Sequence, residues 1–377
     1  MKLVNAEPKT RLFFLDNIRI FLTILVIFHH AAIAYGGTGD WPIQEPATDA
    51  ISPIFLTFFN AINQSYFMSA FFLLAGYFTP RSLEKKGGAK FLSDRLVRLG
   101  IPILIYTTLI INLNTYIVNN YVKGIPYQRQ IAYDPGHLWF LQALFLFALV
   151  YVLLNKFTKW GATNKEGLNQ DPFPTDKFLF LSVIILAVLT FFVRTVFPVG
   201  EWVLRVQLAH FVHYIFSYFA GVLAYRSDWF SRLGKEQAHR WGRIALGMLP
   251  LFFVLFIAGG GLESDANLAN FLGGFYWQAI AYALWETLLL IGITLYLLYF
   301  FRERFNQANA GTKFLAGSAY TVYIIHQTIL FAAQTLLLPI EIHTVLKFFI
   351  ASVVTVVVSL LISIPLRKIP FANRVLG

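Results

Sequence analysis

The sequence predicts an all-α, polytopic integral membrane protein with about ten transmembrane helices and both termini on the cytoplasmic side. Three observations lead to this prediction. Hydrophobic residues make up 57% of the 377 residues and charged residues only 13%, which is more apolar side chain than a soluble chain of this length needs. Ten apolar stretches are each long enough to cross the roughly 30 Å core of a bilayer as a helix. Basic residues also gather in alternate connections along the chain.

We place the spans by the extent of each apolar stretch. In order they are expected at residues 16–35, 54–78, 99–119, 137–155, 178–197, 207–225, 243–260, 275–300, 314–338 and 344–366. Because no internal repeat or appended soluble domain is evident, we expect residues 1–377 to form a single membrane-embedded domain. On the cytoplasmic side it would have short tails at 1–15 and 367–377 and longer loops at 79–98 and 156–177. The opposite loops, at 36–53, 120–136, 198–206 and 261–274, are rich in Gly, Pro and aromatic residues and could form a lid or a binding groove.

The net charge of +11 follows the connections between spans and does not indicate a nucleic-acid partner. Lys and Arg crowd the connections that we place inside, whereas the opposite loops hold acids such as Asp40, Glu45 and Asp49. This distribution obeys the positive-inside rule for a chain that sits in a lipid bilayer. The chain has no cysteine, so disulfides, thiolate nucleophiles and zinc–thiolate sites are excluded, and we expect no metal.

The first span ends in Ala32-Ile33-Ala34, which resembles a signal-peptidase site after a basic start and an apolar stretch. Cleavage there would remove His30. Asp16 and two histidines are poor residues for a signal peptide, and nine more spans follow, so we expect the first span to be retained.

A polar stripe runs along this first span. Eleven residues separate Arg19 from His30, which on a helix is three turns plus roughly 20°, so the two share one face about 16 Å apart. Asp16 and Thr23 fall on the same stripe, whereas His29 points roughly 80° to 100° away. Polar residues inside a membrane span cost free energy and usually mark a functional site. We therefore expect Asp16, Arg19 and His30 in a catalytic site.

Two more titratable residues are expected at a similar depth. His326 lies near the middle of the ninth span, and Glu286 lies about eleven residues from the outer end of the eighth. An imidazole can take up and return a proton near neutral pH, which suits a general base. A carboxylate at this depth should be protonated or paired, and pairing with a histidine would orient that ring. The alternative for both residues is a structural hydrogen bond between helices.

Residues near the outer ends of other spans are candidate contacts to a substrate: His137, Trp139, Arg194, His210 and His213. The histidines have the alternative of bonding a neighbouring helix. Trp139 and Arg194 have the alternative of anchoring the protein at the membrane interface.

At the cytoplasmic mouth of the third span, Arg95 and Arg98 are spaced three apart and so share a helix face. Each guanidinium can bind a phosphate through two hydrogen bonds. Together with Arg81 and Lys90, they predict an anion site. Ordinary positive-inside anchoring is the alternative, and it explains the lysines better than an arginine pair beside Pro102.

Five sequence blocks, in order, resemble the acyltransferase 3 superfamily. They are Leu15-Asp-Asn-Ile-Arg19 followed by His30, Phe71-Phe-Leu-Leu-Ala-Gly-Tyr-Phe78, Arg95-Leu-Val-Arg98-Leu-Gly-Ile-Pro102, His137-Leu-Trp-Phe-Leu141 and Tyr320-Thr-Val-Tyr-Ile-Ile-His326. Arg194-Thr-Val-Phe197 is a weaker match to the branch that contains the glucans biosynthesis protein C. The sequence departs from some relatives at Gln327-Thr328, where they have a second histidine or a proline.

The resemblance implies an O-acyltransferase in the plasma (inner) membrane. Such enzymes move an acyl group, often acetyl or succinyl, from cytoplasmic acyl-CoA to a hydroxyl of a carbohydrate on the far side of the membrane. The resemblance also implies roles in catalysis for Arg19 and His30, and a role on the CoA phosphates for Arg95 and Arg98.

Two other classes of function are open to a chain of this kind. A secondary transporter would carry ionisable residues at the midplane, but we find no inverted repeat and no matched pair of Gly/Pro-broken spans. A non-catalytic membrane scaffold would leave the stripe from Arg19 to His30 unexplained. The sequence leaves a homo-oligomer open.

Overall fold

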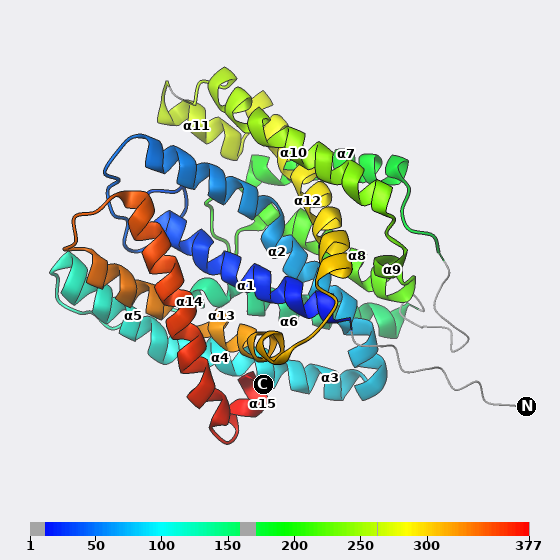
Figure 1. Cartoon of the computed structure of the whole chain (residues 1–377), viewed down its shortest axis with the longest axis horizontal. Helices are drawn as coiled ribbons and strands as arrows, with labels where there is room; N and C mark the ends of the chain where they lie inside the picture. The colour runs from blue at the N-terminus through cyan, green and yellow to red at the C-terminus, as the bar shows by residue number, and fades with distance from the viewer. Residues whose placement is uncertain (1–11, 159–170, 262, 377) are drawn as a thin grey trace, which may run out of the picture.

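The computed structural model describes residues 12–158, 171–261 and 263–376, which form a bundle of helices (Figure 1). Within these residues, nine helical segments are long and apolar enough to cross a membrane. They are α1 (Phe13–Ala34), the run Gly88–Lys123, the run Gly136–Phe157, α7 (Asp176–Val196), the run Leu208–Arg226, α10 (Lys235–Ala258), α12 (Trp277–Arg304), α13 (Ala310–Leu337) and α14 (Thr344–Lys368). The prediction of an all-α, multi-pass membrane protein is therefore confirmed.

The three composite runs consist of shorter elements. Gly88–Lys123 contains α3 (Gly88–Arg95), η1 (Leu96–Gly100), α4 (Ile101–Ile105), η2 (Tyr106–Ile110), α5 (Ile111–Ile117) and η3 (Val118–Lys123). Gly136–Phe157 contains η4 (Gly136–Leu138) and α6 (Trp139–Phe157), and Leu208–Arg226 contains η6 (Leu208–His210) and α8 (Phe211–Arg226). Three short helices, α9 (Trp229–Arg232), α11 (Asp265–Leu272) and α15 (Ala372–Leu376), lie between or after the long ones.

The second expected span, 54–78, lies within α2 (Ile51–Lys86), a helix that is not among the nine. It is 36 residues long and carries polar side chains that the bundle buries, including Asn60, Asn63 and Ser69. Packing against α1, α8 and α12 covers these side chains, so this helix does not need an apolar surface all round.

The expected cytoplasmic loop at 79–98 is helical instead. Helix α2 continues to Lys86, and α3 begins at Gly88 after the single break at Gly87. The segment is rich in Lys, Arg and Leu, which have high intrinsic helix propensity. Of the other expected cytoplasmic segments, residues 1–11 and 159–170 lie outside the described residues, and α14 extends to Lys368 within the tail expected from residue 367.

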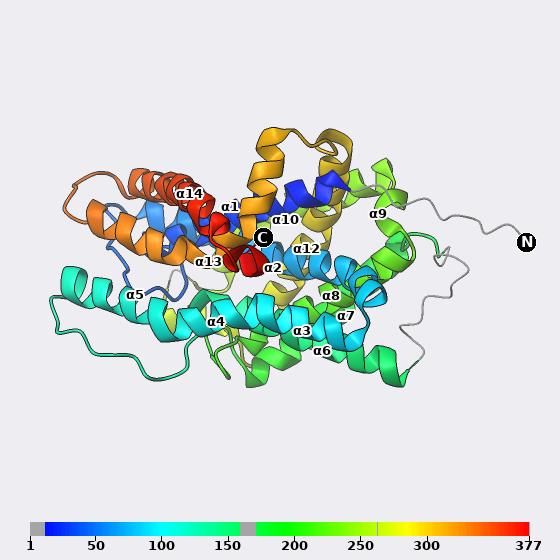
Figure 2. The same cartoon turned by 90° about the horizontal axis from the view of Figure 1, so that it is seen from below.

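Contacts between the helix ends fall into two sets that match the predicted alternation. Segments expected inside join one another through Asn17 to Phe305, Arg302 to Phe230, Arg240 to Asp176 and Tyr320 to Arg98. Segments expected outside join through Thr48 to Thr344, Val199 to Leu272 and Arg205 to Asp134. Figures 1 and 2 show the same division, with α9 toward one end of the bundle and the loop between α13 and α14 at the other.

Helix α14 shows why the bundle needs lipid around it. Its buried face carries small polar side chains with no exposed surface: Ser352, Thr355, Ser359 and Ser363. Its exposed face carries large apolar ones: Val353, Val354, Val357 and Leu361. This arrangement reverses that of a surface helix in a water-soluble protein, and it is stable where the outer solvent is hydrocarbon.

Helices α2 and α8 approach so closely that their contact requires glycine on both sides. A Cβ added at Gly76 would lie 1.9 Å from the backbone oxygen of Tyr218, and one added at Gly221 would lie 2.0 Å from that of Leu73. Small residues at such crossings let backbones meet inside a membrane. The crossing fixes α8, and with it the side chains that α8 presents to the centre of the bundle.

We therefore expect Gly221→Ala to force α2 and α8 apart and to destabilise the protein by about 1–3 kcal/mol, as overpacking generally does. Thermal unfolding in detergent measures this loss. Gly247→Ala is the matched control, because a Cβ at that position of α10 meets nothing within 4 Å. An unchanged melting temperature for Gly221→Ala would show that the close approach does not matter.

Candidate functional site

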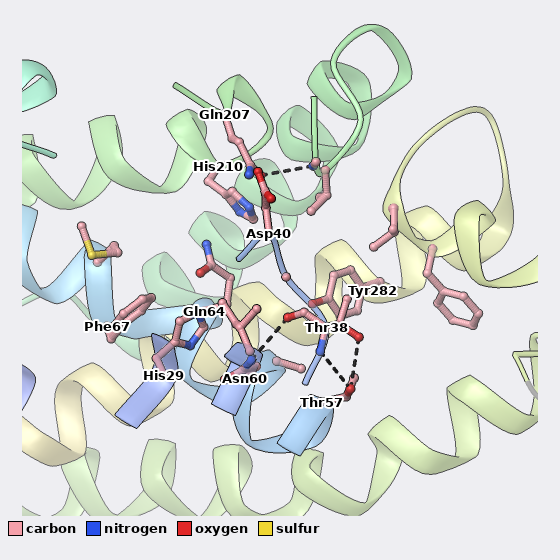
Figure 3. A pocket seen from close by; sticks show the side chains of 18 of the residues that line it. His29, Thr38, Asp40, Thr57, Asn60, Gln64, Phe67, Gln207, His210 and Tyr282 are labelled. Carbon is pink, nitrogen blue, oxygen red and sulfur yellow. Dashed lines mark hydrogen bonds between the residues drawn. The ribbon is translucent and has the colours of Figure 1, made fainter. Parts of the chain in front are cut away.

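A cavity of about 490 Å³ lies at the end of the bundle that we place outside. Figure 3 shows that its wall is polar on several sides, with side chains from widely separated parts of the sequence. Three of the four expected outer loops reach it, namely 36–53, 198–206 and 261–274, whereas 120–136 contributes none of the described lining residues. The cavity also touches four of the predicted site residues, His30, His137, Trp139 and His210.

Two imidazoles from opposite ends of the chain meet beside this cavity. Nδ1 of His30 on α1 lies 2.9 Å from Nε2 of His326 on α13. The two rings are parallel within 3°, with centroids 5.1 Å apart. His30 lines the cavity, whereas His326 is fully buried behind it.

The partners of His326 determine which nitrogen of His30 carries a proton. Nδ1 of His326 lies 2.7 Å from the backbone carbonyl oxygen of Tyr323, which can only accept, so this nitrogen is the donor. A neutral His326 then has its lone pair on Nε2 and accepts the Nδ1–H of His30. Nε2 of a neutral His30 is left unprotonated, which is the form that a general base requires.

His137 packs edge-on against this pair, its ring centroid 4.7 Å from that of His326. Its Nε2 lies 3.0 Å from the carbonyl oxygen of Tyr323, and its Nδ1 lies 2.6 Å from the side-chain oxygen of Gln327. Gln327 also binds the hydroxyl of Tyr106 at 2.5 Å. Gln327, one of the two residues at which the sequence departs from some relatives, therefore joins α13 to His137 on η4 and to Tyr106 on η2.

His29 and Asn60 leave buried polar atoms on the cavity wall without a partner among the described residues: Nδ1 of His29 and Oδ1 of Asn60. His29 packs against Phe67 with ring centroids 4.8 Å apart, and Figure 3 shows both beside the cavity. An unmade hydrogen bond at a buried atom is costly, so these two atoms favour a ligand that supplies donors and acceptors.

A second polar cluster stands behind the wall at His210. Glu286 and Arg194 have no exposed surface and form an ion pair at 2.7 Å. Nδ1 of His210 lies 3.2 Å from the Arg194 guanidinium and 3.6 Å from the second oxygen of Glu286. Glu286 is paired, as expected. Its partner is Arg194, and His210 lies close by.

Two of the predicted substrate contacts are corrected by this arrangement. Arg194 does not stand at the surface, because its charge is neutralised by Glu286 inside the bundle. His213 is buried between the hydroxyls of Thr190 and Thr287, at 3.2 and 3.0 Å, and does not line the cavity among the described residues. Glu286 is likewise absent from that lining and contacts neither His30 nor His326 among the described contacts.

The predicted stripe on α1 is present. Arg19 pairs with Asp16 at 3.0 Å and donates to the carbonyl oxygen of Ala316 at 3.1 Å, which ties the start of α1 to α13. The Thr23 hydroxyl bonds back to the carbonyl of Arg19. Arg19 lies at the inner end of the stripe, and His30 at the cavity.

The four residues predicted to bind an anion lie toward the inner end. Arg98 is exposed, with its guanidinium 5.2 Å from the ring centroid of Tyr320, whose hydroxyl bonds the Arg98 carbonyl at 2.6 Å. Arg95 lies over Phe91, also at 5.2 Å. Arg81 is exposed, and Lys90 pairs with Asp94 at 3.4 Å.

Arg95 and Arg98 do not line the cavity in the part of the chain that the structure describes. Six residues of α13 separate Tyr320 from His326, which is about 9 Å along the helix axis. Tyr323, which lines the cavity and donates to the His137 carbonyl at 2.5 Å, lies between them.

Sequence reasoning missed three residues that shape the site. Trp41 packs against His30 with ring centroids 5.3 Å apart, Tyr323 supplies the carbonyl that sets the tautomer, and Gln327 holds His137. Only Gln327 carried a signal, as a departure from relatives. Trp41 sits in an expected loop, and the role of Tyr323 depends on its backbone, which no side-chain pattern reports.

No group of three His, Asp or Glu side chains in residues 12–158, 171–261 and 263–376 is arranged to hold a metal ion. The exposed arginines and lysines at the inner end are candidates for binding a charged ligand. The groups for binding a neutral polar ligand are those of the cavity wall.

Comparison with known proteins gives a family for this sequence. A family model described as an acyltransferase domain matches residues 12–364. Curated relatives include the glucans biosynthesis protein C of Escherichia coli K12 and that of Escherichia coli O6:K15:H31 strain 536, each 30% identical over 178 residues. This match covers 44% of this chain and 45% of the relative, so it spans less than half the length of either. No solved structure matches the chain.

The buried ion pair makes a direct prediction for stability. Glu286→Gln leaves the Arg194 charge uncompensated inside the bundle, and we expect a loss of about 3–5 kcal/mol in thermal unfolding. Combining it with Arg194→Met should recover part of that loss, because both charges are then gone. Arg205→Gln, which breaks the half-exposed pair with Asp134, should change little. A double variant no more stable than Glu286→Gln alone would contradict the pairing.

Proposed function

The chain belongs to the acyltransferase 3 family, and from this premise we propose that it is a membrane-bound O-acyltransferase. In this proposal it moves an acyl group, acetyl or succinyl, from cytoplasmic acyl-CoA to a hydroxyl of an extracytoplasmic carbohydrate. The basic end of the bundle would face the cytoplasm of a bacterial inner membrane, as the positive-inside rule predicts. The observation that carries the proposal is the hydrogen-bonded line from the Tyr323 carbonyl through His326 to His30.

The chemical step needs a base at the acceptor hydroxyl. Nε2 of His30 takes the hydroxyl proton as the oxygen attacks the carbonyl carbon of the thioester. The new C–O bond forms, the C–S bond breaks, and the proton returns to the CoA thiolate. His326 stabilises the charge on His30 during the step because its Nε2 accepts the Nδ1–H of His30, while its own proton stays on Nδ1 and is donated to the Tyr323 carbonyl.

A covalent route is the main variant of this mechanism. Nε2 of His30 would attack the thioester first and displace the CoA thiolate, giving an acyl-imidazole. The acceptor hydroxyl would then attack the acyl carbon, which forms the C–O bond, breaks the C–N bond and frees His30. A burst of CoA release in the absence of acceptor would identify that route, whereas direct transfer gives none.

The cavity supports a carbohydrate as the acceptor. Its wall combines the aromatic rings of Trp139, Trp202 and Tyr282 with the amides of Asn60 and Gln64. Flat apolar rings with a few fixed polar groups are typical of sites that bury a polar molecule with an apolar face. The name of the curated relatives refers to glucan biosynthesis, which supports a glucan as the class of acceptor.

The donor would bind from the opposite end. Arg95 and Arg98 offer two guanidinium groups to the phosphates of CoA, and Arg81 and Lys90 add positive charge nearby. The thioester would then extend along α13 toward His326, a path that requires the side chain of Tyr323 to move aside.

We expect His30→Ala to reduce acyl transfer by 10²–10⁴-fold, the usual contribution of a general base, while the protein still inserts and folds. The assay follows labelled acyl groups from acyl-CoA into a glucan acceptor, with the melting temperature as a check on folding. His239→Ala is the control, since His239 lies at the inner end, where it hydrogen-bonds Lys235 within α10 and packs on Tyr296 and Tyr299 of α12. Retention of more than about a third of the transfer rate in His30→Ala would refute the role of His30.

Arg98→Ala should raise the KM for acyl-CoA by roughly 10- to 100-fold, the loss expected for hydrogen bonds to a charged group, with kcat little changed. CoA should raise the melting temperature of the unsubstituted protein but not of this variant. Arg304→Ala, at an exposed site on α12, is the control for a lost positive charge. A transporter or a scaffold would show neither hydrolysis of acyl-CoA nor stabilisation by CoA.

A further inference from the structure

An outer segment of residues 36–50, here named the strap, folds back over the end of α1. It turns at Gly36, whose φ of +111° is a conformation that other residues rarely adopt. At its far end Asp49 accepts the Ser52 hydroxyl and the N–H groups at the start of α2, and these bonds lower the pKa of the Asp49 carboxyl. The strap is therefore fixed at both ends.

One buried glutamine clamps the middle of the strap. Gln334 on α13 has no exposed surface, and its amide nitrogen donates to the carbonyl oxygens of Ala34 at 3.2 Å and Ile43 at 2.9 Å. Its amide oxygen accepts the indole N–H of Trp41 at 3.1 Å. Both amide hydrogens of Gln334 are thus used. This one side chain holds Ala34, Ile43 and Trp41 against α13, the helix that also carries His326.

The clamp places the Trp41 ring against His30. The ring centroids are 5.3 Å apart with planes 25° from parallel, and Phe331 packs on Trp41 at 4.8 Å. Trp41 is only 6% exposed although it comes from an outer loop. His30 thus has His326 on one edge and a large apolar ring against its face, while the strap residues Thr38, Gly39 and Asp40 continue along the cavity wall.

We infer that Trp41 is a positioning residue that holds the His30 ring and keeps water away from Nε2, so that a sugar hydroxyl rather than water receives the acyl group. This inference rests on the proposed function. Water at the same place would give hydrolysis: its oxygen attacks the thioester, the C–S bond breaks, and a carboxylic acid and the CoA thiol are released. Both reactions use the same base, so exclusion of water and positioning of the acceptor decide between them.

The first test is the ratio of acyl-CoA hydrolysis to acyl transfer. Trp41→Ala and Gln334→Met should raise this ratio on the order of tenfold. Without the Trp41 ring in place against His30, water can reach the base and the acceptor is oriented less well. Trp41→Phe keeps an aromatic ring and should stay near the unsubstituted ratio. Trp229→Ala, which removes a tryptophan that packs on Phe173 at the inner end, controls for general loosening, which lowers both rates together.

The second test does not depend on activity. Diethylpyrocarbonate modifies accessible, unprotonated imidazoles, and mass spectrometry reports modification at each histidine. His30 should be modified several-fold faster in Trp41→Ala than in the unsubstituted protein, with His239 as the internal reference. Equal rates at His30 together with an unchanged hydrolysis ratio would overturn the role of Trp41.

The two tests separate this inference from the proposed function. If His30→Ala abolishes transfer but Trp41→Ala leaves the hydrolysis ratio and the modification of His30 unchanged, the function stands and the role of Trp41 is wrong. If the unsubstituted protein transfers no acyl group from acyl-CoA, the proposed function fails. Faster modification of His30 in Trp41→Ala would then still establish that the strap shields this ring.

Discussion

The hydrogen-bonded line from the Tyr323 carbonyl through His326 to His30 is the constraint on which the rest of the site depends. It works only if α1 and α13 keep one register, because a shift of one residue on either helix turns its imidazole by about 100°. The contact of Arg19 with Ala316 fixes that register at the inner end, and the bond from Gln334 to the Ala34 carbonyl at the end of α1 fixes it at the outer end. The polar stripe on α1 is thus part of the means by which two helices stay aligned.

The remaining polar groups divide between two ends of the bundle. Arg95 and Arg98 lie at one end, and the cavity with its amides and aromatic rings lies at the other. Tyr320 and Tyr323 lie between them on the helix that carries His326, so α13 links every part of the proposed reaction. The ion pair of Arg194 and Glu286 supports the wall at His210 from behind, where a lone charge would be costly.

Much of this arrangement could be predicted from residues whose chemistry is unusual for a membrane. Asp16, Arg19 and His30 stand out because polar side chains on a shared helix face inside lipid are expensive. The sequence did not show which partner satisfies a charge inside the bundle. Arg194 and Glu286 are 92 residues apart, and no spacing pattern shows that they neutralise each other. Trp41 was missed because a loop has no periodicity from which to infer that it returns to the core. The segment 79–98 was misassigned since span length alone does not show where a helix ends in water.

The tautomer of His30 tests the central claim most directly. Solid-state NMR on the protein in lipid bilayers, with ¹⁵N-labelled histidine, distinguishes protonated from unprotonated ring nitrogens. His30 should carry its proton on Nδ1 and leave Nε2 unprotonated, and this preference should be lost in His326→Ala. A His30 that is protonated on Nε2 in the unsubstituted protein would contradict the account, because that nitrogen could then not take a proton from an acceptor hydroxyl.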